Sequence, residues 1–378
     1  MGCASAYYLK KTDNRLKVAI IEMDPTYTRA STPLSDGNIR VQFNIKENIL
    51  MSLYGLEVLD SFAEDMAVGN QKQDIAFRRQ GNLFLVDADG RVVAERGLKL
   101  QNELGCQVDW LTPERIEGKY PFLNLEKCVG GTLGYRDGTM DPYAVLIGYK
   151  NKAVSLGVEY IKAEVTELLR NKQRISGVRL HSGDVLRSNI VVNTAGAWAS
   201  RIAQTLGIDL PIEPTKRQVF VLETNTQNDS TLPAIIFPSG LYLIHERGGC
   251  FMCGKSLTDD PTGYDDFSWD RQRFTEILWP ELVEFVAAFD RLKIVRGWAG
   301  LYEVNTLDGN AILGEWLDLN GFFLANGFSG HGFQQCHAVG RYLTELILGL
   351  PPSLDLSIFS PKRIIEDKPV FEGRQKLV

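Results

Sequence analysis

Hydrophobic residues recur along the first part of the chain with periods that alternate between helix-like and strand-like. A helix-like pattern covers residues 3–11, and the short apolar run at 17–22 (KVAIIE), which ends in one acid, predicts a buried parallel strand. A longer amphipathic pattern predicts a helix over 46–66. At 82–93 we expect a strand that enters a tight Asp-Gly turn, followed by a helix to about Gly105.

The middle and the end of the chain repeat this alternation around a β-rich segment. The patterns predict, in order, a helix at 141–157, a strand at 158–170, a hairpin pair at 175–196 and a helix at 197–207. After two prolines at 211 and 214 the runs become mostly strand-like, with one helix at about 270–287. The last segment predicts a strand at 321–326, a glycine-rich turn (GFSGHGF) and a helix at 334–350.

The α/β segments therefore fall at the beginning, middle and end of the chain, separated by two β-rich inserts. A chain of 378 residues is too long for one ordinary core, so we expect two domains. We predict an interleaved plan in which residues 1–80, 141–212 and 305–378 form one domain and residues 81–140 and 213–304 form the other.

Composition narrows the classes of partner. The formal net charge of −6 is small, and Lys and Arg are scattered, so we expect no binding to nucleic acid. The sequence contains no run of about eighteen apolar residues, the length that could span a bilayer. The polar residues Lys10 and Lys11 do not favour a signal peptide.

The six cysteines are too sparse for a disulfide framework, so we expect a reducing compartment and a cytoplasmic location. Cys250 and Cys253 form a C-x-x-C in an apolar, strand-like stretch without a second Cys pair or a nearby His. We favour packed thiols over metal or redox chemistry there, and we predict no metal site.

The N-terminal helix follows a glycine in the manner of a dinucleotide-binding turn. In G-x-G-x-x-G the third glycine allows the helix to pack on its strand, and an acid about twenty residues later binds the ribose. Gly2 fits the third glycine and Glu22 fits the acid, although an ordinary helix that begins after a glycine is the alternative. Because a strand and two glycines should come first, we expect the natural chain to begin upstream of Met1.

Four ordered motifs identify a family. YTRASTPLSDGNIR, VVNTAGAWA, GWAGLYEVNTLDGNAILG and NGFSGHGFQQ resemble motifs of the FAD-dependent D-amino acid oxidase superfamily, and in particular of its sarcosine and dimethylglycine oxidising branch. The resemblance covers essentially the whole chain. It implies an α/β, interleaved two-domain FAD-linked reductase fold, with a Rossmann-like FAD-binding domain whose first strand is apparently missing and a β-rich substrate domain.

The motifs and the resemblance together assign the contacts to FAD. Glycines in GFSGHGF let a strand turn abruptly into a helix, so that the free N–H groups of the helix N-terminus face the flavin and stabilise the negative charge of its reduced form. A solvated loop is the alternative for Ser31 and Thr32, and core packing is the alternative for Val165 and Trp198. The expected cofactor-binding residues are Gly2, Glu22, Ser31, Thr32, Arg40, Val165, Ala195, Gly196, Trp198, Gly300, Gly327, Ser329, Gly330, His331, Gly332 and Phe333.

The implied reaction is oxidation of a C–N bond in a small amine or N-methyl amino acid, by hydride transfer to flavin N5. Tyr302 stands where glycine oxidase relatives place an Arg that clamps the substrate carboxylate, Gln334 stands where sarcosine oxidases have a Lys, and Phe43 replaces a companion Arg. We therefore do not expect a strong ion pair with a carboxylate. The catalytic candidates are Arg40, Tyr302, Gln334, His245 and Tyr242, with core packing the alternative for the last two.

Other departures from the family pattern concern the flavin link and the electron acceptor. Gly300 replaces the Cys that attaches flavin in some relatives, and no matching His lies near Ser31, so noncovalent FAD is expected. Met252 replaces a lysine that assists reaction with oxygen, and Lys255 should lie on the wrong face of its strand. We therefore favour a dehydrogenase that uses a carrier over an oxidase. A flavoprotein with a binding or respiratory-complex assembly role and little turnover is the alternative.

Overall fold

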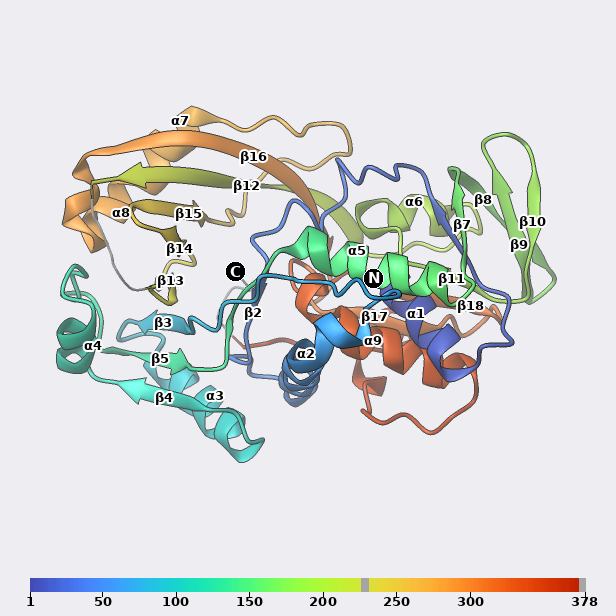
Figure 1. Cartoon of the computed structure of the whole chain (residues 1–378), viewed down its shortest axis with the longest axis horizontal. Coiled ribbons are helices and arrows are strands. Elements are labelled where there is room, and N and C mark those ends of the chain that lie inside the picture. The colour runs from blue at the N-terminus through green and yellow to red at the C-terminus, as the bar shows by residue number, and fades with distance from the viewer. Residues whose placement is uncertain (226–230, 374–378) are drawn as a thin grey trace.

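Two groups of elements lie side by side in the structure, a sheet-rich group and a helix-rich group (Figure 1). The structure is a computed structural model and describes residues 1–225 and 231–373. The chain passes between the groups several times, because the sheet-rich group takes β3, β4 and β5 from one stretch and β12 to β16 from another. This mixed α/β architecture confirms the predicted fold class, while the exact domain boundaries stay a prediction.

The sheet-rich group is built on one eight-stranded sheet with the order β16-β12-β15-β14-β13-β3-β5-β4. All neighbours pair antiparallel except β13 and β3, which run parallel. The strands are β3 (Asn82–Val86), β4 (Val108–Leu111), β5 (Gly130–Gly134), β12 (Ile212–Thr224), β13 (Ala234–Ile236), β14 (Tyr242–Arg247), β15 (Cys250–Gly254) and β16 (Leu292–Asn305). The helices are α3 (Arg91–Glu103), α4 (Pro113–Lys119), α7 (Arg271–Arg273) and α8 (Trp279–Phe285), with a π-helical segment at Phe274–Leu278 and a 3-10 turn at Ala287–Asp290.

The two faces of this sheet differ because side chains alternate along each strand. One face carries a large apolar core that includes Phe220, Phe251 and residues of α4, the π-helical segment and α8. The other face carries a smaller cluster that includes Phe84, Tyr242 and Met252. We call this second face the site face, since the candidate residues described below lie on it.

The helix-rich group packs helices against short parallel strands. Strand β1 pairs parallel with β7, and β11 pairs parallel with β18, while α1 lies against α5 and α9. Its helices are α1 (Gly2–Thr12), α2 (Lys46–Asp65), α5 (Pro142–Ser155), α6 (Ala199–Gln204), α9 (Gly332–Ile347) and α10 (Lys362–Ile365), with 3-10 turns at Gly196–Trp198 and Ser357–Phe359. Its strands are β1 (Ala19–Glu22), β2 (Asn38–Ile39), β6 (Gly138–Thr139), β7 (Glu159–Lys162), β8 (Val165–Asn171), β9 (Arg174–Leu180), β10 (Val185–Arg187), β11 (Val191–Asn193), β17 (Ile312–Glu315) and β18 (Phe322–Asn326).

Four sequence predictions need correction. The strand expected at 82–93 ends at Val86, because the Asp87 carboxylate accepts the N–H of Gly90 and a helix begins at Arg91. The strand expected at 158–170 is two strands, β7 and β8, which belong to different sheets. The helix expected at 270–287 is broken into α7, a π-helical segment and α8. Strand β1 is only partly buried, because among the described strands it pairs with β7 alone.

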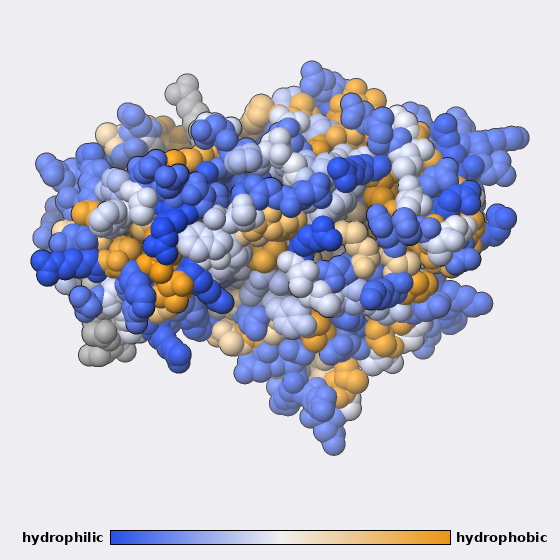
Figure 2. All heavy atoms as spheres, turned by 90° about the horizontal axis from the view of Figure 1, so that it is seen from above, coloured by the Kyte–Doolittle hydropathy of each residue, from blue (hydrophilic) through white to orange (hydrophobic). Residues whose placement is uncertain are grey.

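The surface and the cysteines are those of an ordinary globular chain. The face seen in Figure 2 is mostly hydrophilic, with hydrophobic residues in small groups. All six cysteines are free, and Cys250 and Cys253 point to opposite faces of β15; Cys253 is buried as a packed thiol, whereas Cys250 is only half-buried. Within residues 1–225 and 231–373, no helix is long and apolar enough to cross a membrane, and no group of three or more His, Cys, Asp or Glu side chains could hold a metal.

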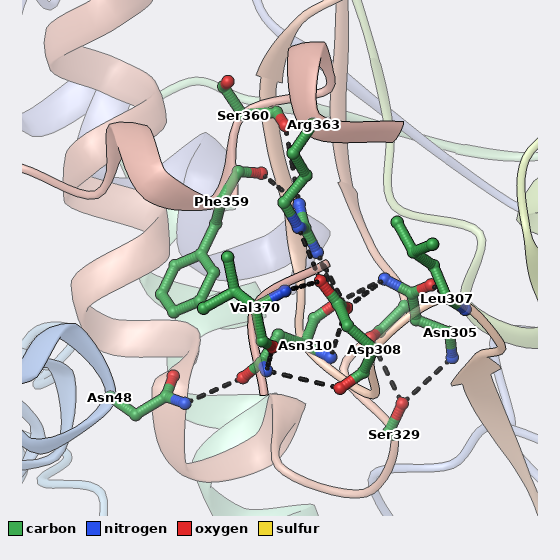
Figure 3. Close-up of polar contacts among 11 residues, drawn as sticks. Asn48, Asn305, Leu307, Asp308, Asn310, Ser329, Phe359, Ser360, Arg363 and Val370 are labelled. Carbon is green, nitrogen blue, oxygen red and sulfur yellow. Dashed lines mark hydrogen bonds and ion pairs between the residues drawn. The ribbon is translucent and has the colours of Figure 1, made fainter. Parts of the chain in front are cut away.

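A buried polar network joins the end of the chain to the rest of the helix-rich group (Figure 3). At its centre the Asp308 carboxylate accepts hydrogen bonds from the Arg363 guanidinium and from the N–H of Val370, with donor–acceptor distances of 2.8 to 3.2 Å. It also accepts from the side chain of Asn305 and the N–H of Asn310. Both members of the ion pair are buried, so each charge is stabilised by its partner and not by water.

Replacing Asp308 with alanine should therefore leave the Arg363 guanidinium buried without its partner. We expect Asp308→Ala to lower the free energy of unfolding by about 3–5 kcal/mol. Urea denaturation followed by circular dichroism, at a fixed FAD concentration, measures this change. Asp318→Ala, at an exposed position between β17 and β18, is the matched control and should change it by less than about 0.5 kcal/mol. Equal stability of the two variants would contradict the role given to the network.

Candidate active site

The turn between β18 and α9 presents unpaired backbone donors. Gly327, Ser329 and Gly330 have positive φ angles of 71°, 49° and 103°, which turn the strand abruptly into the helix. In the described structure the N–H groups of Gly332 and Phe333, at the start of α9, donate to no protein acceptor. Unpaired N–H groups and the helix dipole together make this end of α9 a site of positive potential. This is the geometry that the GFSGHGF motif predicts.

The last residues of strand β16 hold the glycine-rich turn in place by hydrogen bonds. The Glu303 carboxylate accepts the N–H of Gly327 at 3.0 Å, and the backbone carbonyl of Glu303 accepts the N–H of Ser329 at 3.2 Å. The Ser329 hydroxyl accepts the N–H of Asn305 at 2.9 Å. Sequence reasoning missed Glu303 as a positioning residue, because a single acid in a strand gives no signal of the turn that it contacts.

Arg40 is held next to the start of α9, as expected. Its backbone N–H donates to the side-chain oxygen of Gln334 at 2.8 Å, and its guanidinium donates to the carbonyl of Gln42 at 2.6 Å. The guanidinium also stacks over the Phe43 ring, with 4.1 Å between its carbon and the ring centroid. Gln334 therefore anchors the backbone of Arg40 with the oxygen of its side chain.

The tautomer of His331 follows from Arg40. A guanidinium can only donate, so the Nε2 atom of His331, 3.2 Å from Arg40 Nη2, must be the acceptor. Burial and the charge of Arg40 lower the pKa of His331 to about 3. His331 is thus neutral at physiological pH, and the positive charge stays on Arg40.

Tyr302 and Tyr242 lie together on the site face. The Tyr302 ring packs on the glycine-rich turn, since a Cβ atom built at Gly330 would lie 2.5 Å from its Cε2. The Tyr242 hydroxyl lies against Gly254 of β15, where a Cβ would lie 2.4 Å from the oxygen. Burial raises the pKa of Tyr302 to about 12 and that of Tyr242 well above its usual value, so both hydroxyls remain protonated donors.

Asp36 and Arg217 complete the charges around these tyrosines, and sequence analysis overlooked both. The Asp36 charge raises the pKa of Tyr302 and of Tyr242, whereas Arg217 and Arg40 lower the pKa of Tyr302. Asp36 follows the quoted Ser31 and Thr32 by only a few residues and could have been singled out with them. Arg217 could have been found only from its pairing with β16, which brings it opposite Gly300.

The structure separates His245 from this group. His245 and Tyr242 are three residues apart on β14, so they point to opposite faces, and the His245 ring packs on Phe251 in the large core. Its Nδ1 accepts the N–H of Leu232, and its Nε2 lies 3.0 Å from the carbonyl of Gly248. His245 links the backbone at Leu232 to the backbone at Gly248 by hydrogen bonds, and this placement does not support a role in the substrate pocket.

Lys255 lies on the far side of the sheet, as predicted. Its ammonium pairs with Glu281 of α8, the helix that covers the large core. Met252 is on the site face, packed with Tyr242 and Phe84. Among the described residues, neither Lys255 nor Met252 thus places an ammonium group on the site face at this position.

The residues expected around the nucleotide come from three elements. A Cβ at Gly2 would lie 2.8 Å from Thr194 Oγ1, so the start of α1 lies against the turn that follows β11. Glu22, at the end of β1, accepts the N–H of Asp24, and burial raises its pKa. Gly196 has a φ of 55° with open space before it, and Ala195 is exposed.

The remaining nucleotide candidates have protein contacts of their own. Val165 begins β8 and is half-buried. Trp198 is also half-buried, and its ring centroid lies 6.3 Å from that of Tyr264. The Ser31 hydroxyl donates to the carbonyl of Leu301 at 2.7 Å, and the Thr32 carbonyl accepts from Ser35. The loop that carries Ser31 and Thr32 therefore lies along β16, and its predicted contact with phosphate stays a prediction.

These features fit FAD. The close approach of Gly2 and the acid at the end of β1 suit a dinucleotide, and the open backbone at Gly196 leaves room for it. Arg40 and the start of α9 supply positive potential at one place, which suits an electron-rich ring. The residues that would hold the ring system are thus Arg40 and the glycine-rich turn, while Leu34 lies over the predicted contact at Gly300.

The contact between Gly330 and Tyr302 gives a direct test of the turn. We expect Gly330→Ala to displace the Tyr302 ring and to weaken FAD retention by about tenfold or more, because a methyl group and the ring cannot share the space. Gly349→Ala, also at positive φ but with open space, is the control. It should cost only about 1 kcal/mol of backbone strain and leave FAD retention unchanged. Flavin absorbance after desalting measures retention, and equal retention in the two variants would refute the packing argument.

The carboxyl of Glu303 should make stability depend on pH. Burial raises its pKa to about 7, whereas an unfolded Glu titrates near 4.3. The folded state therefore binds a proton that the unfolded state has released, and this contribution to stability is complete below about pH 4 and lost as pH rises through about 7. We expect Glu303→Gln to flatten the fall in stability between pH 5 and 8, as measured by urea midpoints. The exposed Glu57→Gln should keep the wild-type slope, and a Glu303→Gln slope like that of the wild type would argue against this assignment.

Several known proteins are similar to this chain over most of its length. FAD-dependent oxidoreductase domain-containing protein 1 of Xenopus laevis is 36% identical over 98% of this chain and 82% of its own length. Mitochondrial dimethylglycine dehydrogenase of Rattus norvegicus is 28% identical over 96% of this chain and 43% of its own. The crystal structure of L-proline dehydrogenase from P. horikoshii matches with a TM-score of 0.85 and 27% identity, over 97% of this chain and 96% of that one.

The family itself is shown by the sequence match. Residues 1–346 match the FAD dependent oxidoreductase family, abbreviated DAO. This confirms the resemblance that the four motifs indicate and the expectation of FAD as cofactor. The chain therefore belongs to the DAO family of FAD-dependent oxidoreductases.

Proposed function

We propose that this oxidoreductase oxidises the C–N bond of a small N-methyl amino acid or similar amine, of the sarcosine or dimethylglycine kind. FAD, when bound, supplies the two-electron acceptor at its N5 atom. The relatives named as dehydrogenases of dimethylglycine and L-proline support an amine or amino acid substrate. The observation that carries the proposal is that Arg40, the start of α9 and the two site-face tyrosines meet where the two groups of elements join.

Each of these groups has a task in the proposal. Arg40 and the N–H groups at the start of α9 favour added negative charge beside them, because Arg40 is a buried cation and the helix dipole is positive at this end. Gln334 and His331 keep Arg40 in place without neutralising it. These contacts therefore favour acceptance of electrons from the substrate.

The tyrosines orient the substrate. Both hydroxyls are protonated donors at physiological pH, so they can bind the polar groups of the substrate without taking its proton. The apolar residues around Tyr242, which are Phe84, Ile236, Ile244 and Met252, suit the methyl groups of an N-methylated amine and exclude water. The substrate carbon is thereby held close to the acceptor.

Two positions, Gly300 and Met252, bear on how the flavin is held and on which electron acceptor is used. Gly300 offers no thiol, which supports noncovalent FAD. Lys255 is paired with Glu281 on the far side of the sheet, so it cannot assist reaction with oxygen on the site face beside Met252. We therefore favour a dehydrogenase that passes electrons to a carrier. We also propose a cytoplasmic location, which six free thiols support.

Anaerobic reduction of the bound flavin tests the proposal. We expect bleaching of flavin absorbance by at least one of sarcosine, dimethylglycine and L-proline in a stopped-flow experiment. Tyr302→Phe should slow the reduction by about tenfold or more if its hydroxyl orients the substrate. Tyr120→Phe, in the core on the far face of the sheet, is the control and should keep the wild-type rate. Bleaching by no amine would refute the enzyme and favour the binding or assembly role.

A further inference from the structure

Arg217 on β12 belongs to the site face. Strands β12 and β16 pair antiparallel, with Thr215 opposite Tyr302 and Arg217 opposite Gly300. Residues directly opposite each other in such a pair point to the same face. The guanidinium carbon of Arg217 lies 5.5 Å from the centroid of the Tyr302 ring, which places this cation beside the tyrosine that the proposed function uses.

One edge of the Arg217 guanidinium is without a protein partner. Nη1 donates to the Asp260 carboxylate and to the carbonyl of Leu257. The structure shows no hydrogen bond from Nη2 to a described residue, and Nε is buried without an acceptor. The Nε and Nη2 atoms form the edge that binds a carboxylate through two parallel hydrogen bonds.

The local charge also calls for an anion. Asp260, whose side chain is 1% exposed, pairs with both Arg217 and Arg273. Two guanidinium groups therefore share one carboxylate in a largely buried place, which leaves one positive charge unmatched. A buried unmatched charge is costly, and an anionic group of a ligand would offset it.

The residue opposite Arg217 on β16 has no side chain. Gly300, opposite Arg217, contributes no atoms beyond the backbone, and Leu34 lies over it at 3.0 Å from the position of a Cβ. The loop that carries Leu34 leads directly to Asp36 and Arg40. Arg217 thus lies at one end of a row of polar groups that continues through Tyr302 toward Arg40.

We propose that Arg217 binds the carboxylate of the substrate through its Nε and Nη2 atoms, so that the enzyme selects amino acids over amines that lack a carboxylate. This rests on the proposed function and narrows its substrate class. It replaces the expectation, based on Gln334, Phe43 and Tyr302, that no strong ion pair with a carboxylate forms. Arg217 is a specificity-determining residue in this proposal, since the bond that reacts lies elsewhere on the substrate.

Two readouts on the FAD-loaded protein test this assignment. The first is anaerobic flavin reduction by matched pairs, sarcosine with dimethylamine and L-proline with pyrrolidine, from which a Kd and a limiting rate are obtained. The second is the change in flavin absorbance on titration with tetrahydro-2-furoate, a carboxylate that lacks the amine. We expect Arg217→Gln to raise the Kd of each carboxylate by about 30-fold or more and that of pyrrolidine by less than about threefold. The limiting rate with L-proline should change much less than the Kd.

Two further variants serve as a matched control and as a charge-conserving comparison. Lys216→Gln removes a buried, ion-paired cation from the next position of the same strand, but on the opposite face, where Lys216 pairs with Asp266. It should leave both readouts within about threefold of the wild type, because only Arg217 faces the substrate. Arg217→Lys keeps the charge but lacks the two-donor edge, and it should lose most of the carboxylate affinity. If Arg217→Gln does not retain FAD, the lysine variant decides the question.

Several outcomes would overturn the assignment. They are an unchanged affinity for tetrahydro-2-furoate in Arg217→Gln, an equal loss for pyrrolidine and L-proline, or no binding of tetrahydro-2-furoate to the wild-type protein. The two proposals fail separately. A wild-type protein that no amine reduces refutes the proposed reaction, whereas one that is reduced equally well by both members of each pair refutes only the role of Arg217.

Discussion

The guanidinium of Arg40 and the N-terminus of α9 lie next to each other in this structure, and both are centres of positive potential. Within the described residues Arg40 makes no ion pair, although it is buried, and its hydrogen bonds go to a carbonyl and to a neutral imidazole. Like charges at this range repel, most strongly where water is excluded. Gln334 and Phe43 hold Arg40 in place by contacts that carry no charge, and the carboxylates of Glu372, Asp137 and Asp36, which do not contact it, offset part of the repulsion. An anionic or electron-rich ligand is what such an arrangement stabilises.

Strand β16 connects this centre to the sheet. It pairs with β12 from Leu292 to Asn305, and its last residues, Glu303 and Asn305, also hold the glycine-rich turn through hydrogen bonds. Tyr302, just before them, touches the turn at Gly330. Strand β16 and the glycine-rich turn are therefore joined directly by hydrogen bonds. A shift of the sheet by even 1 Å would move the turn with it, and such misplacement is costly for catalysis.

Much of this site could be predicted from the sequence, since the glycine-rich turn, Arg40 and Tyr302 lie within recognisable motifs. What could not be predicted depends on strand pairing. Arg217 has no motif around it, and only the register of β12 against β16 brings it to Tyr302. His245 shows the opposite case, because its spacing of three residues from Tyr242 places them on different faces of β14. The alternation of side chains along a strand is a property of the sequence spacing, so it is sufficient by itself to separate these two residues. The break between β7 and β8 had no such signal, since it falls at Ala163 and Glu164, where no glycine or proline marks the end of a strand.

The end of the described chain also acts on the charge of the site. Glu372 is 5% exposed, and its carboxylate accepts the N–H of Asn44 and the side-chain amide of Asn48. Its charge favours the protonated form of Arg40 without contacting it, so the positive charge is eased but not cancelled. Asp308 fixes this segment by accepting the N–H of Val370 (Figure 3). A direct ion pair between Glu372 and Arg40 would occupy the guanidinium and lower the potential that the site face experiences. Burial lowers the pKa of Arg40, and Glu372 opposes this shift from a distance, so that within the described residues the guanidinium is left without a carboxylate contact.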